Sequence, residues 1–320
     1  MNAPVPTVRF VGSKAQGLGV ARALSEPGRL WRLEIVTLDD RADVRSVLAD
    51  FNALAAERTL PYTVVRSRRD VSAALSAAVD LTVVVGWYWL LNADERASSR
   101  LGVVGIHNSL LPRYRGGAPL VWAMIQGERT VGATLFSLGD GMDDGDVWAQ
   151  VSVPVGPQDT VADVLARLEP EATRMLLEAL PAMLSGARRP QPQRHEDATF
   201  ATQRMADDGV IDWRLPAQRV YDCIRAQTRP YPGAFTYLDG RRMTVWRALL
   251  GAGHWHATAG QVIAVQAPLV LVACGDGGVL ALHEVELDGV IAQAADVIRT
   301  RSVRFPQVPL VLDRMRELNA

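Results

Sequence analysis

Two side chains suited to acid–base chemistry occur in different loops of the sequence. His107, one of five histidines, follows the apolar run 101–106 and precedes a loop rich in proline and glycine. Asp143 lies in a later, glycine-bounded acidic loop, 141–146. A carboxylate beside an imidazole favours the charged ring and fixes its orientation. Together the two residues predict a site that moves a proton or stabilises a developing negative charge.

Each of these residues also has a plain structural interpretation. A histidine at a strand end can simply cap the strand, and taken alone His107 favours that interpretation. An acidic loop between glycines can be a solvated turn or a calcium-type loop. The combination of His107 with the acidic loop around Asp143 is what favours a catalytic site.

A parallel α/β sheet is predicted to position His107. Residues 81–85 are almost wholly apolar and β-branched, which is typical of a central parallel strand covered on both faces. Apolar runs alternate with helical patterns, and this alternation predicts a doubly wound, Rossmann-like, mostly parallel sheet. His107 would stand at the carboxyl end of one strand, where open α/β sheets bind ligands. The expected strands are 8–11, 33–38, 62–65, 81–85 and 101–106, and the helices between them are 17–24 and 44–56.

The rest of the chain divides into three parts. Helices at about 119–126 and 161–184, with strands near 134–137 and 147–153, complete a first domain over residues 1–185. Residues 186–204 are polar and aperiodic, so we interpret them as a linker. A helix at 217–227 and five short β-rich segments then predict a small β-barrel domain over 205–320.

Bulk composition is that of an ordinary globular protein. The 320 residues are 48% hydrophobic and 22% charged, with a formal net charge of −1, so the whole chain has no electrostatic drive toward nucleic acid or anionic membranes. Local arginine groups, such as 66–69 or 188–189, could still form a basic patch. Two unpaired cysteines, and no apolar run long enough to span a bilayer, predict a cytoplasmic protein without membrane partners.

A family resemblance rests on the His107 loop. The run 107–112, then Arg115 and Gly116, then the acidic residues 143–146, resembles the signature of the 10-formyltetrahydrofolate-dependent formyltransferases. Stretches within 207–235 resemble the small OB-like barrel of methionyl-tRNA and aminoarabinose formyltransferases. The resemblance implies formyl transfer from 10-formyltetrahydrofolate, as co-substrate, to an amine, without a metal.

The resemblance also implies roles for individual residues. His107 would be catalytic, and Asp143 would organise it together with a bound water. Residues expected beside the folate are Trp87, Tyr88, Trp89, Leu90, Ser109, Leu111, Asp140 and Gly141. Those expected to face the acceptor are Tyr114, Arg115 and Gly116. For Trp87 and Trp89, packing in the core at a strand end is an equally good interpretation.

One position departs from the family pattern. The family usually has Asn two residues before the histidine, where it steadies the oxyanion, and this chain has Gly105. Loss of one oxyanion donor typically costs about 100- to 1000-fold in rate. His107 could carry the oxyanion alone, or Asn108 could swing in although it points to the other face of the strand. The third explanation is drift toward a related transfer, or toward folate binding without turnover.

A different enzyme class and the identity of the acceptor both stay open. Gly17, Gly19 and Asp39 resemble a dinucleotide-binding fingerprint of NAD(P)-dependent oxidoreductases, but Arg22 occupies the third glycine position. Residues 37–43 are short and acidic where methionyl-tRNA formyltransferases carry a basic insertion, so tRNA is a less favoured acceptor. We expect a small amine, such as a nucleotide-linked amino sugar or an amino-acid precursor like hydroxyornithine. A homodimer through the barrel also stays open.

Overall fold

The computed structural model describes residues 4–307. Contacts divide the chain into two compact units. Unit 1 takes in the described residues up to Pro119, together with Val131–Val153 and Ala166–Ala201. Unit 2 takes in Leu120–Thr130, Pro154–Leu165 and the described residues from Thr202 onward.

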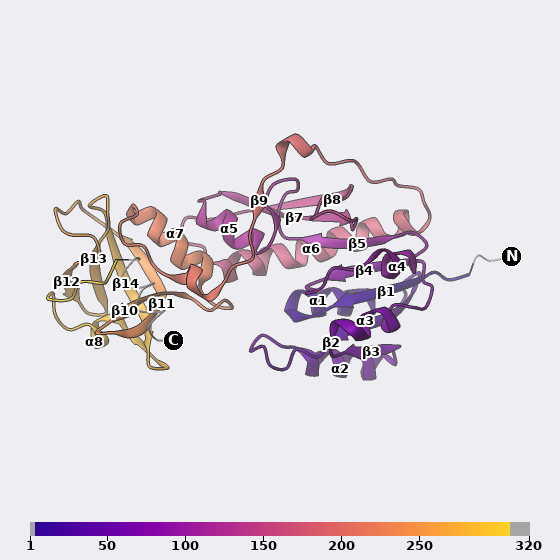
Figure 1. Cartoon of the computed structure of the whole chain (residues 1–320), viewed down its shortest axis with the longest axis horizontal. Coiled ribbons are helices and arrows are strands. Elements are labelled where there is room, and N and C mark those ends of the chain that lie inside the picture. Colours follow the sequence, from indigo (N-terminus) through magenta and orange to yellow (C-terminus); the bar gives the residue numbers. More distant parts are fainter. Residues whose placement is uncertain (1–3, 308–320) are drawn as a thin grey trace. The chain divides into compact units, whose positions relative to one another are not determined.

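A seven-stranded sheet forms the centre of the first part of the chain (Figure 1). Its order is β3-β2-β1-β4-β5-β7-β8. Strands β1 to β5 run parallel, and β7 is antiparallel to β5. Every residue of β4 is buried, because its apolar side chains are covered on both faces of the sheet. The predicted doubly wound, mostly parallel sheet is confirmed. The strands are β1 (Thr7–Gly12), β2 (Arg32–Leu38), β3 (Tyr62–Val65), β4 (Leu81–Val85), β5 (Val103–His107), β7 (Thr130–Ser137) and β8 (Val147–Pro154).

The helices differ from the prediction mainly where they begin. Helix α1 begins three residues earlier than expected, so Gly17 and Gly19 lie inside it. Helix α2 begins later than expected, because Asp40 and Asp43 hydrogen-bond to Ser46 and Arg45 and hold that segment as a loop. The helices of this part are α1 (Lys14–Leu24), α2 (Leu48–Arg58), α3 (Arg68–Ala74), α4 (Ala93–Ala97), α5 (Pro119–Ile125) and α6 (Val161–Leu184).

Within the segment expected to be a linker, one stretch is held to the rest of unit 1 by hydrogen bonds. We call residues 191–201 the strap; its end, β9 (Phe200–Ala201), is labelled in Figure 1 and pairs in parallel with β6 (Arg115–Gly116). At its start, Gln191 and Val147 exchange two backbone hydrogen bonds. Attachment through backbone and amide hydrogen bonds needs no apolar periodicity, so no sequence pattern predicts it. The predicted domain boundaries themselves stay a prediction.

Unit 2 is built on an antiparallel sheet with α7 packed against β11. The order is β10-β11-β14-β13-β12, and β15 pairs with β14. This confirms the predicted carboxyl-terminal β domain, while its OB-like character stays a prediction. The elements are η2 (Ala206–Gly209), α7 (Ala217–Gln227), β10 (Ala234–Leu238), β11 (Arg241–Gly251), β12 (Val262–Gln266), β13 (Leu269–Ala273), β14 (Val279–Leu287), β15 (Val290–Gln293) and α8 (Ala294–Val297).

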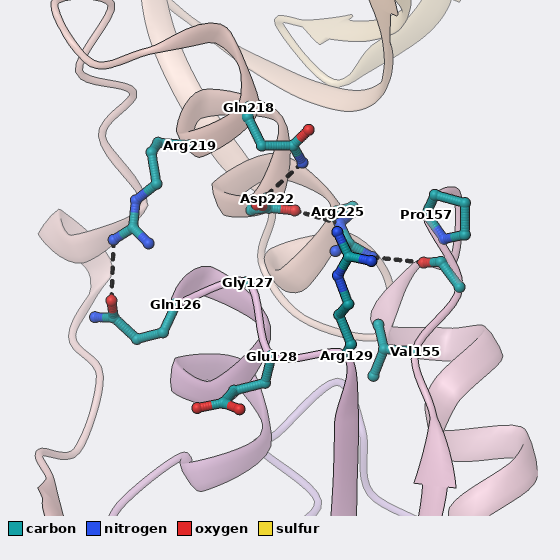
Figure 2. Close-up of a pocket in the computed structure, with 11 residues that line it drawn as sticks. Gln126, Gly127, Glu128, Arg129, Val155, Pro157, Gln218, Arg219, Asp222 and Arg225 are labelled. Carbon is teal, nitrogen blue, oxygen red and sulfur yellow. Dashed lines mark hydrogen bonds and ion pairs between the residues drawn. The ribbon is translucent and has the colours of Figure 1, made fainter.

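Helix α7 contains a buried ion pair, and the arginine of this pair also holds the helix to a loop within unit 2. The Nε of Arg225 lies 2.7 Å from Oδ1 of Asp222, and both side chains are almost fully buried. The same guanidinium donates to the carbonyl oxygens of Gly156 and Asp159, at 3.1 and 2.9 Å. Figure 2 shows Asp222 and Arg225, with Arg219 of the same helix, among the residues that line a pocket. Its cavity has a volume of about 420 Å³. All donors and acceptors named here are satisfied within the protein, so the pair holds structure.

No helix among residues 4–307 combines the length and the apolar character needed to cross a lipid bilayer.

Candidate active site

Strand β5 delivers His107 to the carboxyl edge of the sheet, and the following loop curls back over it. The ring is nearly buried, and its Nε2 lies 2.8 Å from the carbonyl oxygen of Tyr114. A carbonyl oxygen only accepts hydrogen bonds, so Nε2 carries a proton. Tyr114 has φ of 56° and Gly116 has φ of 103°. These left-handed conformations turn the loop back, and a side chain at Gly116 would lie 2.3 Å from the carbonyl oxygen of Ala201.

The acidic loop brings Asp143 to the other side of the same imidazole. Its Oδ2 lies 3.5 Å from Nδ1 of His107 and accepts a hydrogen bond of 2.8 Å from the Gly116 amide. The structure therefore places the two predicted catalytic side chains next to each other. A ring protonated at both nitrogens would face an acceptor on each side: the Tyr114 carbonyl and the Asp143 carboxylate. The two acceptors fix the orientation of the ring.

Behind this pair lies a buried polar network that the sequence did not suggest. The side-chain oxygen of Gln193 accepts hydrogen bonds from Nε and Nη2 of Arg115, at 3.1 and 2.7 Å. Its side-chain nitrogen donates to the carbonyl oxygens of Asp143 and Gly145, at 2.9 and 2.7 Å. Gln193 is only 7% exposed. No motif could have identified it, because it stands in an aperiodic polar segment.

Arg115 is predicted to face the acceptor, but its side chain is turned into the interior of unit 1. Its side chain is buried, and besides Gln193 it contacts Nδ1 of His195 at 3.2 Å. The arginine therefore braces the strap against the loop that follows His107. Tyr114 is only partly buried, and its contact with an acceptor stays a prediction.

Asn108 lies next to His107 in sequence, but its side chain is engaged elsewhere. Its amide and the amide of Gln16 exchange two hydrogen bonds, of 3.0 and 3.1 Å. At Gly105, a Cβ atom would lie 2.7 Å from Cδ1 of Leu138. The Leu138 side chain thus approaches the position that an asparagine side chain would need.

In the loop after β4, residues 87–90 alternate between buried contacts and exposure. Trp87 and Trp89 form an edge-to-face contact, with ring centroids 5.5 Å apart, and pack against the apolar core of the sheet. The buried indole nitrogen of Trp87 has no hydrogen-bond partner among residues 4–307. Tyr88 and Leu90 alternate with the tryptophans and are exposed. The loop therefore combines core packing with an apolar surface at the carboxyl edge of the sheet.

Opposite charges cluster beside Tyr88 at the same edge. The Nζ of Lys14 lies 2.6 Å from Oδ2 of Asp40 and 2.8 Å from Oδ2 of Asp43. Burial disfavours the charged ammonium, but the hydrogen bonds to the two carboxylates outweigh it and raise the pKa of Lys14. Beside Asp43, the Arg45 guanidinium holds the pKa of that carboxyl far below its usual range. The basic groups of this loop are therefore paired with acids.

The remaining residues predicted to bind folate have varied surroundings. Ser109 and Leu111 are buried, and the Ser109 hydroxyl donates to the Arg113 carbonyl oxygen at 2.6 Å. Asp140 has an exposed side chain that forms an ion pair with Arg96. Gly141 is exposed too. Contact of these residues with folate stays a prediction.

The structure does not support a dinucleotide-binding turn at Gly17 and Gly19. Gly17 and Gly19 lie within α1, whereas the turn after β1 is made by Gly12 and Ser13. The glycines thus cannot form the phosphate-binding turn of a dinucleotide fold, and that interpretation was wrong. Among residues 4–307, no group of three or more His, Cys, Asp or Glu side chains could hold a metal ion.

Two family descriptions match the chain. "Formyl transferase" matches residues 42–180, and "Formyl transferase, C-terminal domain" matches residues 204–302. A methionyl-tRNA formyltransferase of Anaeromyxobacter dehalogenans (strain 2CP-1) is 35% identical over 295 residues, which cover 90% of this chain and 94% of that protein. One from Sorangium cellulosum is 37% identical over 242 residues, covering 74% of this chain and 76% of that protein.

Solved structures with the same fold include a sugar formyltransferase and a protein bound to tetrahydrofolic acid. WlaRD, a sugar 3N-formyltransferase, aligns with a TM-score of 0.66 at 12% identity and covers 88% of this chain and 98% of its own. HypX from Aquifex aeolicus, in complex with tetrahydrofolic acid, aligns with a TM-score of 0.63 at 19% identity. That alignment covers 92% of this chain, which spans about half (47%) of the length of HypX.

Proposed function

Because the chain belongs to the formyl transferase family, we propose that it transfers a formyl group from 10-formyltetrahydrofolate to an amine, with His107 and Asp143 as the catalytic pair. The observation that carries the assignment is the distance of 3.5 Å between Nδ1 of His107 and Oδ2 of Asp143 at the carboxyl edge of the sheet. Ligands of open α/β sheets bind at this edge.

The proposed chemistry is direct attack by a neutral amine on the formyl carbon. A carbon–nitrogen bond forms to the amine, and the bond from the formyl carbon to the folate nitrogen breaks. The imidazolium of His107 stabilises the negative charge on the formyl oxygen and helps to move a proton from the amine to the departing nitrogen. Asp143 supports the positive charge of the ring. For Nε2 to reach the formyl oxygen, its hydrogen bond to the Tyr114 carbonyl must be shared or released.

We place the folate beside the loop that carries Trp87 to Leu90. Exposed Tyr88 and Leu90 offer apolar surface for a flat ring. The unpartnered indole N–H of Trp87 offers a donor, because a buried polar group without a partner costs free energy. Ser109, Leu111, Asp140 and Gly141 complete the proposed pocket.

As acceptor we propose a small amine, such as a nucleotide-linked amino sugar or an amino-acid precursor. The loop after β2 supports this choice, because Lys14 is paired with Asp40 and Asp43, and Arg41 is paired with Asp39. Binding of a polyanion depends on basic groups that are free to meet phosphates. Tyr114 and Gly116 would line the acceptor side.

A second candidate acceptor is methionyl-tRNA. It is favoured by the relatives from Anaeromyxobacter and Sorangium, which carry that name and align over most of their length. An acceptor screen with 10-formyltetrahydrofolate separates the candidates. Methionyl-tRNA, nucleotide-linked amino sugars and hydroxyornithine are each incubated with the protein, and the mass of a new formamide is measured. Formamide on methionyl-tRNA alone would overturn the small-amine proposal.

Replacement of His107 tests the catalytic assignment. We expect the His107→Ala protein to lose at least about 100-fold in kcat, the loss typical of a general acid–base group. His254→Ala is the matched control, because His254 is an exposed histidine in unit 2. Formyl transfer by His107→Ala at the parental rate would show that the assignment is wrong.

A further inference from the structure

We propose that Gln193 of the strap is a positioning residue of the active site, holding Asp143 in place beside His107. The inference rests on the proposed function above. The strap lies outside both stretches that match the family descriptions, residues 42–180 and 204–302.

The side-chain amide of Gln193 is saturated by four hydrogen bonds within unit 1. Its nitrogen bridges the carbonyl oxygens of Asp143 and Gly145, and its oxygen accepts two bonds from Arg115. Both Gln193 and Arg115 are buried, with exposures of 7% and 4%. Removal of the amide would leave buried donors and acceptors without partners, which the loop can relieve only by moving.

The conformation of the acidic loop makes this bridge important for Asp143. Asp143 has φ of 48°, a left-handed conformation that is unfavourable for a residue with a side chain. Such a conformation persists only where its surroundings hold it. The bonds from Gln193 to the carbonyls of residues 143 and 145 hold this backbone, and the held backbone directs Oδ2 toward Gly116 and His107.

The other end of the strap fixes the second partner of the imidazole. The Thr199 hydroxyl accepts a hydrogen bond of 2.9 Å from the Tyr114 amide, and the Thr199 carbonyl accepts one of 2.8 Å from the Arg115 amide. Tyr114 supplies the carbonyl that contacts Nε2 of His107. The strap therefore holds the neighbours of both ring nitrogens, Asp143 through Gln193 and Tyr114 through Thr199.

The first test compares Gln193→Ala with Gln191→Ala. Gln191 stands in the same strap with an exposed side chain, so it is a matched control. We expect Gln193→Ala to lower kcat about 10- to 100-fold, the cost of a small misplacement of catalytic groups. The KM for 10-formyltetrahydrofolate should change less than about 3-fold, because Gln193 is buried behind the site. The control should keep the parental kcat.

A double-variant cycle identifies Asp143 as the residue through which Gln193 acts. In an Asp143→Asn background, Gln193→Ala should change kcat less than about 3-fold. An unchanged loss of 10- to 100-fold in that background would overturn the inference. Gln193→Glu is the second variant, for the case that the alanine variant does not fold. It keeps the contact with Arg115 but turns an oxygen toward two carbonyls, so it should lower kcat as well.

An activity-independent measurement keeps the two proposals separate. The Gly116 amide donates to Asp143 Oδ2, so its hydrogen exchange reports the position of the carboxylate. We expect this amide to exchange at least about 10-fold faster in Gln193→Ala and within about 3-fold of the parent in Gln191→Ala. Parental exchange in Gln193→Ala would overturn the positioning role. Failure of the parental protein to form any formamide would instead overturn the proposed function and leave the exchange result standing.

Discussion

The carboxylate of Asp143 and the imidazole of His107 lie 3.5 Å apart between Oδ2 and Nδ1, while the other ring nitrogen lies 2.8 Å from a backbone carbonyl oxygen. Both neighbours of the ring are acceptors. A neutral imidazole can donate to only one of them, whereas an imidazolium donates to both. Asp143 and the Tyr114 carbonyl therefore fix the orientation of the His107 ring from both sides.

The first prediction concerns Asp143. Asp143→Asn keeps the size of the side chain and an oxygen to accept from Gly116, but it removes the negative charge beside His107. We expect a loss of about 100-fold in kcat, measured in a formyl-transfer assay under saturating substrates. Asp146→Asn, in the same loop with an exposed side chain, should keep kcat within about 2-fold. Equal activity of the two variants would contradict the role of Asp143.

The second prediction concerns the space beside Gly105. A side chain here would lie 2.7 Å from Cδ1 of Leu138, so Gly105→Asn should destabilise the protein by about 1–3 kcal/mol through overpacking. Leu138→Ala removes the obstruction, and the double variant should be more stable than the sum of the single changes implies. Urea unfolding of all four proteins measures this coupling. Strict additivity would show that Leu138 does not occupy the asparagine position.

Activity of the same proteins tests the missing oxyanion donor. If an asparagine at position 105 can donate to the formyl oxygen, the double variant should turn over faster than Leu138→Ala alone, since one such donor is worth about 100-fold or more. An unchanged kcat would indicate that the donors of this site are arranged differently.

The third prediction is a pH dependence that arises from Glu95. Burial disfavours the charge of this carboxylate, but Arg68, Ser72 and the Asn92 amide more than offset the burial and lower its pKa below the usual value of 4.5. The folded state then binds fewer protons than the unfolded state. The stabilisation is complete above about pH 4.5 and is lost as the pH falls through the lower pKa of the folded protein.

Glu95→Gln tests this dependence. At pH 7 we expect the free energy of unfolding to fall by about 1–3 kcal/mol, because the charge-assisted bonds are lost. The difference from the parent should shrink below pH 4.5, as followed by urea unfolding at several pH values. Asp94→Asn, at the exposed neighbouring position, should change little. An equal deficit at pH 3 and pH 7 would contradict the assigned pKa direction.

The fourth prediction concerns the ion pair of unit 2 shown in Figure 2. Arg225→Met leaves the buried carboxylate of Asp222 without its cation, which typically costs about 3–5 kcal/mol. Arg219→Met, on the same helix but half-buried and hydrogen-bonded to Gln126, should cost no more than about 1 kcal/mol. Thermal melting of the two variants measures the contrast. Similar melting temperatures would indicate that Arg225 contributes no more than Arg219.

The sequence by itself determined the sheet and the place of His107 on it. Runs of β-branched residues such as 81–85 and the long pattern of α6 (Val161–Leu184) are local signals, since they report which residues one element must bury. The acidic loop between glycines, together with the family resemblance, identified Asp143 as the partner of His107. Helix starts were less well predicted, because hydrogen bonds of Asp40 and Asp43 decide where α2 begins.

Only the tertiary structure decided which polar side chains meet. Gln193, Arg115 and Asp143 come from three separate segments, and Asn108 finds its partner in Gln16, 92 positions earlier in the sequence. Hydrogen bonds between distant segments leave no period in the sequence, because any polar residue at a given position looks the same until the chain has folded around it. The direction of Arg115 into unit 1, the engagement of Asn108 and the packing of the strap all depended on contacts of this kind.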